Sequence, residues 1–209
     1  MSDTLDSDWN LRIGSINVQG GNENGFFEEV AKWGRDIALF DIIACQETKF
    51  HADKNTRYLL QEKGEEIKYH GYWASDTVHT MGSGVAFLVG TKWTKYILKT
   101  SKYKGRGIAL DFGFHSGTHI RIINCYVPAN RAEERGKKEF QELVEWVTKE
   151  IQNAEKSGME AVVCGDFNGV VNPALDRHTI TRGTLTENAL LEWLINNQFT
   201  DSFRKLYPE

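Results

Sequence analysis

The stretch Val162-Val163-Cys164-Gly165-Asp166-Phe167-Asn168 joins a short apolar run to a glycine, a carboxylate and an amide. Valine favours strands, and a glycine after such a run lets the backbone turn where the strand ends. Because residues two apart in an extended backbone face the same side, we expect Asp166 and Asn168 to point into one site. A carboxylate can take a proton from water, while an amide donates hydrogen bonds without adding negative charge. This pairing suits the attack of water on a phosphate ester.

Three other apolar runs end in polar residues of the same kind, within residues 13–20, 42–48 and 124–130. A single polar residue at a strand end usually caps a turn or stays in solvent. Four strand ends with compatible chemistry instead favour a shared site. If these ends converge on one edge of a pair of sheets, they gather five side chains in one cleft, namely Asn17, Glu47, Tyr126, Asp166 and Asn168.

The composition indicates one globular domain. The chain has 209 residues, 40% of them hydrophobic and 26% charged, which is ordinary for a folded protein. The net charge of −4 argues against a strongly basic nucleic-acid-binding surface but leaves room for a local basic face. Residues 1–10 are acidic and polar, unlike a secretory or transit peptide, and we expect them to form a disordered tail before a domain at 11–209.

The three cysteines predict a reducing environment. Cys45, Cys125 and Cys164 each lie within or at the end of an apolar run, and no pair has metal-ligand spacing. Buried free thiols are therefore expected rather than a disulfide framework. No apolar run approaches the length of a membrane span. We expect an intracellular protein, in the nucleus or the cytoplasm.

The periodicity predicts an α+β fold with one or two sheet layers and helices outside. We expect strands at 11–18, 41–46, 69–74, 84–89, 93–98, 107–114, 119–126 and 161–164, those from 84 to 126 forming an antiparallel meander. Helices are expected at 26–40, 55–63 and 132–154. A further helix should run to about Asn196 from a capping box made by Thr184 and Glu187.

An ordered set of motifs resembles the endonuclease/exonuclease/phosphatase superfamily, which has the deoxyribonuclease I-like fold. The matching segments are Ser15-Ile16-Asn17-Val18-Gln19-Gly20, Gln46-Glu47-Thr48, residues 82–88, Tyr126-Val127-Pro128 and Gly165-Asp166-Phe167-Asn168. Within that superfamily, Leu175-Asp176-Arg177 and residues 201–208 are most similar to the endonuclease domains of LINE-type retrotransposons. The resemblance spans the chain from about Leu11.

The resemblance implies two packed mixed β-sheets flanked by helices, and hydrolysis of DNA phosphodiesters assisted by Mg²⁺ or Mn²⁺. By this resemblance Glu47 is the metal ligand, a hard oxygen donor suited to a hard cation. Asn17 would lie beside it and orient the metal or the phosphate.

The resemblance also assigns roles to the remaining candidates. Asp166 would orient or deprotonate the attacking water. Asn168 and Tyr126 would donate hydrogen bonds to the scissile phosphate as negative charge builds on it. Arg106 and Asn130 are weaker candidates for contacts to the substrate.

The chain departs from the family pattern after Pro208. The pattern continues with a strand that carries an Asp and closes with a Ser-Asp-His strand, and this sequence contains neither. His178, in Asp176-Arg177-His178, is interpreted as a surface loop residue. We therefore expect a domain that is incomplete at its C-terminus, with little nuclease turnover by itself, and a second polypeptide or a downstream domain that completes the fold.

Two other functions fit the same residues. The first is another enzyme of the superfamily, such as a phosphatase acting on inositol phosphates or a sphingomyelinase-like lipase. The second is a non-catalytic remnant that binds nucleic acid or a protein. The segments 92–96 and 99–106 mix aromatic with basic residues, as in loops that track phosphates and stack bases, although a solvated strand face has the same composition.

Overall fold

The fold comes from a computed structural model, which describes residues 10–20, 40–49, 58–60, 69–76, 83–171 and 188–207. The chain divides into two compact units. The first unit comprises Met1–Tyr126 and Val147–Asp166, and the second comprises Val127–Trp146 and Phe167–Glu209. The expected tail at residues 1–10 lies outside the described residues except for Asn10.

The first unit contains a five-stranded sheet with strand order β1-β2-β5-β4-β3. Its strands are β1 (Ile13–Asn17), β2 (Ile42–Gln46), β3 (Tyr58–Leu60), β4 (Tyr69–Ala74) and β5 (Val85–Gly90). Strands β1 and β2 run parallel, and the other neighbours are antiparallel. The sheet is therefore mixed, with β1 at one edge of the described strands.

A four-stranded sheet with order β6-β7-β8-β9 completes the first unit. Its strands are β6 (Ile97–Tyr103), β7 (Gly107–Gly113), β8 (His119–Tyr126) and β9 (Glu160–Asp166). Strands β6 to β8 form an antiparallel meander, whereas β9 pairs with β8 in parallel. A parallel pair needs a crossover; here α2 (Glu134–Lys156) lies between the two strands in the chain.

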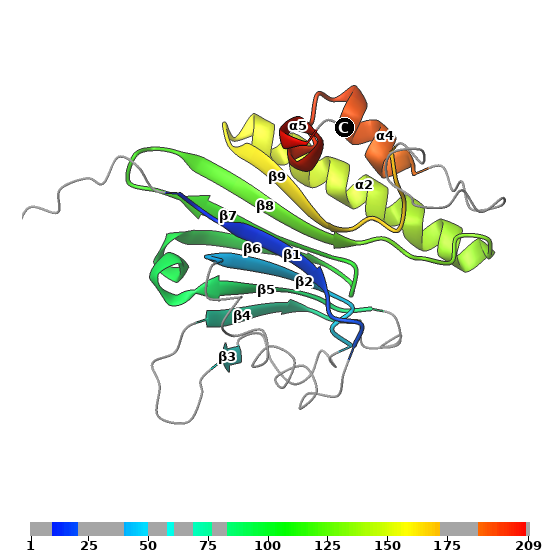
Figure 1. Cartoon of the computed structure of the whole chain (residues 1–209), viewed down its shortest axis with the longest axis horizontal. Helices are drawn as coiled ribbons and strands as arrows, with labels where there is room; N and C mark the ends of the chain where they lie inside the picture. The colour runs from blue at the N-terminus through cyan, green and yellow to red at the C-terminus, as the bar shows by residue number, and fades with distance from the viewer. Residues whose placement is uncertain are drawn as a thin grey trace, which may run out of the picture. The chain divides into compact units, whose positions relative to one another are not determined.

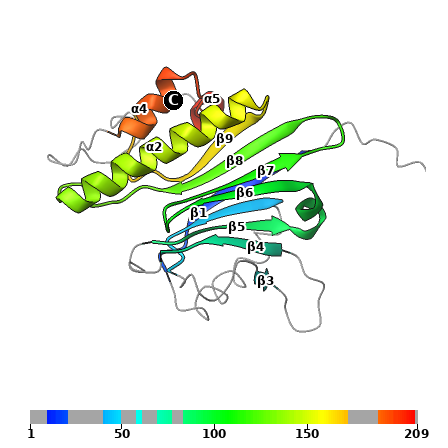
Figure 2. The same ribbon diagram turned by 180° about the vertical axis from the view of Figure 1, so that it is seen from behind.

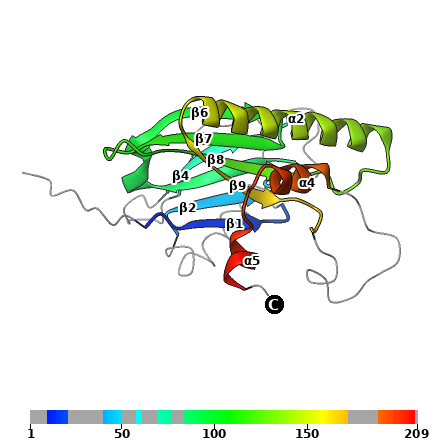
Figure 3. The same cartoon turned by 90° about the horizontal axis from the view of Figure 1, so that it is seen from above.

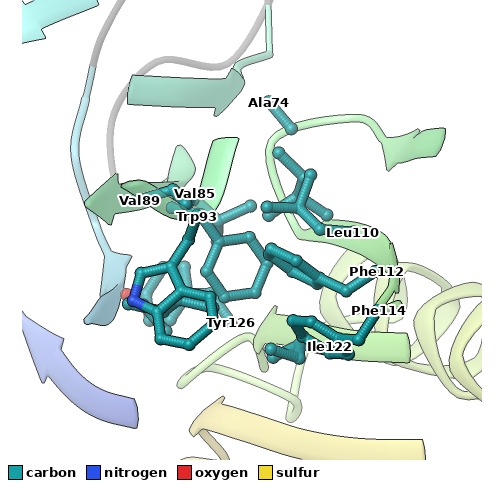
Figure 4. Packing of buried hydrophobic residues seen from close by; sticks show 13 residues of the cluster. Ala74, Val85, Val89, Trp93, Leu110, Phe112, Phe114, Ile122 and Tyr126 are labelled. Carbon is teal, nitrogen blue, oxygen red and sulfur yellow. The ribbon is translucent and has the colours of Figure 1, made fainter. Parts of the chain in front are cut away.

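The two sheets pack face to face and enclose the core (Figures 1 and 2). Phe87 of β5 and Phe112 of β7, one from each sheet, are among the largest side chains with no exposed surface. Figure 4 shows aliphatic and aromatic residues of this cluster, among them Phe112 and Phe114, whose rings stack with centroids 6.1 Å apart. Burial of such rings is the main stabilising contribution to a fold of this kind.

A buried ion pair fixes the second half of α2, which belongs to the first unit. Arg121 of β8 binds Asp111 of β7 through Nε and Nη2, at 2.6 and 2.7 Å. Its Nη1 lies 2.8 Å from both the backbone oxygen and Oε2 of Glu150 in α2. Figure 3 shows this half of the helix running along the four-stranded sheet. Its apolar side, with Val147 and Ile151, is fully buried.

The second unit contains two further described helices, α4 (Ala189–Asn196) and α5 (Ser202–Leu206). Asn188 caps α4 by accepting hydrogen bonds from the backbone N–H groups of residues 190 and 191. Asp201 caps α5 in the same way. The predicted end of α4 at Asn196 is confirmed, but its cap is Asn188, and Thr184 and Glu187 lie outside the described residues.

The predicted fold class, two packed mixed sheets with helices, is confirmed.

Three element predictions are wrong. Residues 91–96 form a 3₁₀ helix, η2 (Thr91–Tyr96), so β6 begins only at Ile97 and the basic segment 99–106 is a strand and a turn. Strand β5 belongs to the other sheet, not to the meander. Residues 58–60 are a strand within the predicted helix 55–63. Most of the predicted helix 26–40 lies outside the described residues.

The cysteines are free thiols, as predicted. Cys45 and Cys125 are buried, and Cys164 is partly buried. Burial raises the pKa of the Cys45 thiol to about 12, and that of Cys164 to about 12 as well. Such thiols are protonated and unreactive near neutral pH, in keeping with a packing role.

Candidate active site

Three strands of the first unit change from apolar to polar along the face that looks into the core. Because alternate residues of a strand face the same side, each strand contributes a series of positions two apart. Apolar residues of these series pack in the core, and polar ones follow toward the C-terminal end of the strand. The series are Ile13, Ser15 and Asn17 in β1, Ile122, Asn124 and Tyr126 in β8, and Val162, Cys164 and Asp166 in β9.

Asn17 and Asp166 meet at this polar end. The side-chain nitrogen of Asn17 donates a hydrogen bond of 2.8 Å to Oδ2 of Asp166. The Asn17 oxygen accepts a 2.8 Å bond from the backbone N–H of Gln19, so the amide is held on both sides. The carboxylate of Asp166 is therefore oriented by a donor whose own position is fixed.

Tyr126 lies beside Asp166, one of the two candidate carboxylates. It is the register partner of Asp166 in the parallel pair of β8 and β9, and it is 6% exposed. Burial raises the pKa of Tyr126, and the negative charges of Glu47 and Asp166 raise it further, while the charge and hydrogen bond of Arg106 oppose them. Glu47 directly follows Gln46, the register partner of Asn17, and Asn17 is bonded to Asp166, so both carboxylates lie at the same end of the first unit.

Arg106 also belongs to this group. Its guanidinium lies 5.1 Å from the centroid of the Tyr126 ring, and its backbone oxygen accepts a 2.8 Å bond from the Tyr126 N–H. The turn that carries it is fixed to a neighbouring segment, because the N–H of Gly84 donates to the oxygen of Gly105 at 2.8 Å. A cation is therefore held beside the phenol of Tyr126.

Glu47 follows β2 in a left-handed backbone conformation, with φ of 59°. Its carboxylate lies 3.5 Å from Nζ of Lys49, and Nζ also donates to the backbone oxygen of Gln19 at 3.1 Å. Gln19 and Lys49 have positive φ as well, 53° and 56°. Non-glycine residues rarely adopt this conformation, and such strain concentrates at functional sites.

Gly165 has a different role from the predicted one. The strand does not end there but continues to Asp166, and Gly165 has φ of +142°. A Cβ at this position would lie 1.9 Å from the backbone oxygen of Cys125. The glycine is required because β9 passes very close to β8 just before Asp166.

Asn168, in the second unit, does not follow the extended geometry that was predicted for it. Its φ is 43°, so the rule that residues two apart share a face does not hold after Asp166. Its side-chain nitrogen donates to the oxygen of Val127 at 2.7 Å. The oxygen of Asn168 accepts a 2.9 Å bond from Arg131, a buried residue whose guanidinium lies 4.9 Å from the Phe140 ring centroid.

Asn130, also in the second unit, holds the turn that leads into α2. Its side-chain oxygen accepts from the N–H of Ala132 at 3.1 Å, and its nitrogen donates to Glu133 at 3.0 Å. This is the local bonding expected of an asparagine before a helix. The Leu175-Asp176-Arg177 motif and His178 lie outside the described residues.

Sequence reasoning missed a buried polar pair behind the site. Gln46 of β2 and Asn124 of β8 are almost fully buried and bonded to each other at 2.8 Å across the two sheets. Both residues stand in the strand-end segments that were singled out. Their pairing had no signal in the sequence, because 78 positions separate them.

The donors at this site fit a hard divalent cation. Within the described residues, no three or more His, Cys, Asp or Glu side chains cluster as a metal-binding group. Mg²⁺ is commonly bound by one or two carboxylates, with waters and substrate phosphate oxygens completing its shell. Glu47 is of that type, because it is a single carboxylate at the strand end where Asn17 and Asp166 meet. Among the described helices, none is both long and apolar enough to cross a membrane.

Comparison with known proteins agrees with this reading of the fold. Residues 14–206 match the model of the Endonuclease/Exonuclease/phosphatase family, so the chain belongs to that family of hydrolases acting on phosphoric ester bonds. The catalytic domain of Xenopus laevis APE2 superposes with a TM-score of 0.67 at 20% identity, covering 95% of this chain and 73% of that one.

A second solved structure has the same fold. The human Nocturnin catalytic domain, solved with a bound sulfate anion, has a TM-score of 0.61 at 16% identity and covers 94% of this chain and 73% of its own. No curated protein sequence matches the chain.

Proposed function

We propose that this protein hydrolyses DNA phosphodiesters with the help of Mg²⁺ or Mn²⁺, as an endonuclease. The observation that carries the proposal is that Asn17 orients Asp166, which pairs with Tyr126 in the sheet, at the strand end that Glu47 follows. Two carboxylates, a phenol and a cation in one place can activate water and hold a phosphate. The motif resemblance to LINE-type retrotransposon endonucleases, and a nuclear or cytoplasmic location, are part of this proposal.

Asp166 is the proposed base. Its carboxylate would accept a proton from the attacking water, and the bond from Asn17 keeps it in one orientation. Tyr126 and Arg106 are the proposed donors to the phosphate. The raised pKa of Tyr126 keeps its hydroxyl protonated near neutral pH, so that it can donate to a developing negative charge.

Glu47 is the proposed metal ligand, with Asn17 next to it. A divalent cation bound there would supply positive charge to the phosphate oxygens and to the leaving oxygen. Lys49, with Nζ 3.5 Å from Glu47, would give up this carboxylate when the cation binds. Asn168 and Asn130 stay predictions as substrate contacts. The side-chain amide of each already donates a hydrogen bond within the second unit.

The DNA strand would approach over Lys49, Lys104 and Arg106. These cations lie in segments that directly follow β2 and β6. The ammonium of Lys104 lies 5.1 Å from the Tyr103 ring centroid, so a basic and an aromatic group are presented together. Such pairs contact phosphates and stack bases in proteins that bind single strands.

A partner segment is part of the proposal. Among the described strands, β1 pairs only with β2 and β9 only with β8, in both cases in parallel. Each of these strands thus has one backbone edge without a partner among the described strands, and proteins normally pair or cover such edges. We infer that β-strands from a second polypeptide or a downstream domain pair with these edges.

A plasmid nicking assay tests the proposed function. With protein in excess over supercoiled plasmid and with Mg²⁺ or Mn²⁺, slow nicking is expected, and Glu47→Gln and Asp166→Asn should each slow it about 100-fold or more. Asn197→Ala is the matched control, because it removes one exposed amide bond, to Trp193, in the second unit. Its rate should be unchanged.

Three results would reject the proposal. Nicking that survives both substitutions would assign the activity to other residues or to a contaminant. Salt-sensitive DNA binding without nicking would favour the non-catalytic reading. Release of phosphate from inositol phosphates, with DNA left intact, would favour a phosphatase.

A further inference from the structure

Gln46 and Asn124 form a hydrogen-bonded spacer between the two sheets. Both N–H groups of the Asn124 amide are used, one to the oxygen of Cys45 at 3.0 Å and one to that of Ala86 at 2.9 Å. The Asn124 oxygen accepts from Gln46 at 2.8 Å. The Gln46 nitrogen also lies 3.1 Å from Oγ of Ser15 and 3.1 Å from the oxygen of Ala44. The spacer therefore joins β1, β2, β5 and β8.

The place of this spacer is unusual for polar groups. Asn124 has no exposed surface and Gln46 is 1% exposed, at the point where the apolar core gives way to the site. Burying an amide is unfavourable unless its hydrogen bonds are made. A network that is satisfied to this degree instead rigidifies the structure around it.

Glu47 directly follows the spacer and is fixed on both sides. The oxygen of Gln46 accepts from the N–H of Val18 at 3.0 Å, and the N–H of Thr48 donates to the oxygen of Gly84 at 3.0 Å. Between these two anchors Glu47 adopts φ of 59°. A strained residue keeps such a conformation only where its surroundings leave it no other.

We propose that Gln46 and Asn124 are positioning residues that hold Glu47 in the conformation that binds the divalent cation. The proposal rests on the function proposed for Glu47 and adds the two buried residues that fix its backbone. Neither residue touches the cation or the phosphate. Their effect passes through the backbone of Gln46 to the carboxylate of the next residue.

The test measures Mn²⁺ binding directly, by titration calorimetry on the whole chain without substrate. Gln46→Met keeps the length of the side chain and removes its N–H groups. We expect it to weaken Mn²⁺ binding about 10- to 100-fold, the range found when groups behind a metal ligand are removed. Ser15→Ala removes only one acceptor of the spacer and should weaken binding about two- to fivefold.

Trp93→Phe is the matched control. It removes a buried hydrogen bond of 2.8 Å from the Trp93 ring to Asp41, which precedes the opposite end of β2. It should lower the midpoint of thermal unfolding but leave the Mn²⁺ dissociation constant unchanged. Ser15→Ala keeps the test decisive if Gln46→Met does not fold.

Glu47→Gln separates the two proposals. If it leaves Mn²⁺ binding unchanged, the metal role of Glu47 in the proposed function is wrong. If it weakens binding while folded Gln46→Met and Ser15→Ala bind as the unsubstituted chain does, the spacer does not position Glu47. If Trp93→Phe weakens Mn²⁺ binding as much as Gln46→Met does, the spacer contributes only to general stability and the proposal is wrong.

Discussion

The side-chain amide of Asn17 donates a hydrogen bond of 2.8 Å to the carboxylate of Asp166, although the two residues lie 149 positions apart. The bond joins β1, at the edge of the five-stranded sheet, to β9, at the edge of the four-stranded sheet. It therefore ties the two sheets together at the end where Glu47, Tyr126 and Arg106 lie. A bond from an amide to a carboxylate is stronger than one between neutral groups.

Asn17→Ala should lower kcat for plasmid nicking about 10- to 100-fold, because Asp166 loses the donor that orients it. The free energy of unfolding should fall by about 1.5–3 kcal/mol, the net contribution of a hydrogen bond to a charged group. Single-turnover nicking and urea unfolding would measure both effects. A fall in kcat no larger than that of the control Asn197→Ala would show that Asn17 does not act on the reaction.

The sequence singles out Asn17, Glu47, Tyr126 and Asp166 as candidates because each ends or directly follows a recognisable apolar run. Strand periodicity predicts which side chains face the core, and the motif resemblance predicts which role each candidate has. What the sequence could not predict is backbone conformation after the strand. Asn168 was expected to face the same way as Asp166, but a φ of 43° redirects it, and asparagine is tolerated both in extended and in left-handed backbone.

The spacer behind the site could not be predicted for another reason. Gln46 and Asn124 stand in strands whose other inward residues are apolar, such as Ala44 and Ile122. Taken alone, each is a polar residue within an apolar run, and such a residue weakens the prediction of a buried strand. Only the packing of the two sheets brings them within hydrogen-bonding distance, and sequence separation gives no sign of it.

Gly165→Ala should destabilise the protein by roughly 2–4 kcal/mol. The added Cβ would meet the oxygen of Cys125, and a φ of +142° is unfavourable for alanine. Gly158→Ala is the control, since Gly158 also has positive φ, +65°, but has open space around its Cβ position. It should cost about 1 kcal/mol. Equal losses in urea unfolding would show that the close approach of β9 to β8 imposes no constraint.

Arg121→Met should destabilise the protein by about 3–5 kcal/mol, because it leaves the carboxylates of Asp111 and Glu150 buried without their cation. Arg135→Ala provides the comparison. Arg135 pairs with Glu139 at 2.8 Å, but its side chain is 57% exposed, so its loss should cost at most about 0.5 kcal/mol. A small effect of Arg121→Met in thermal and urea unfolding would mean that water or rearrangement compensates for the buried pair.

Asp41 should make stability depend on pH. Burial by itself would raise its pKa, but the hydrogen bonds from Lys92, the Arg12 N–H and the Trp93 ring outweigh burial and lower the pKa below its ordinary value of 3.8. The folded state therefore favours the charged carboxylate. Its contribution to the free energy of unfolding is complete above the ordinary pKa and is lost as the pH falls through the lower, folded value.

Asp41→Asn should accordingly be less stable than the unsubstituted protein at pH 7, because the neutral amide cannot pair with Lys92, whose Nζ lies 2.8 Å from Oδ1 of Asp41. The difference should begin to narrow once the pH falls below about 4, where Asp41 of the unfolded chain takes up a proton, and should narrow until the pH passes the lower, folded pKa. Urea unfolding of both proteins at pH 7 and at about pH 3 would measure it. A difference that stays constant between these two pH values would mean that Asp41 stabilises the fold by its shape and hydrogen bonds, not by its charge.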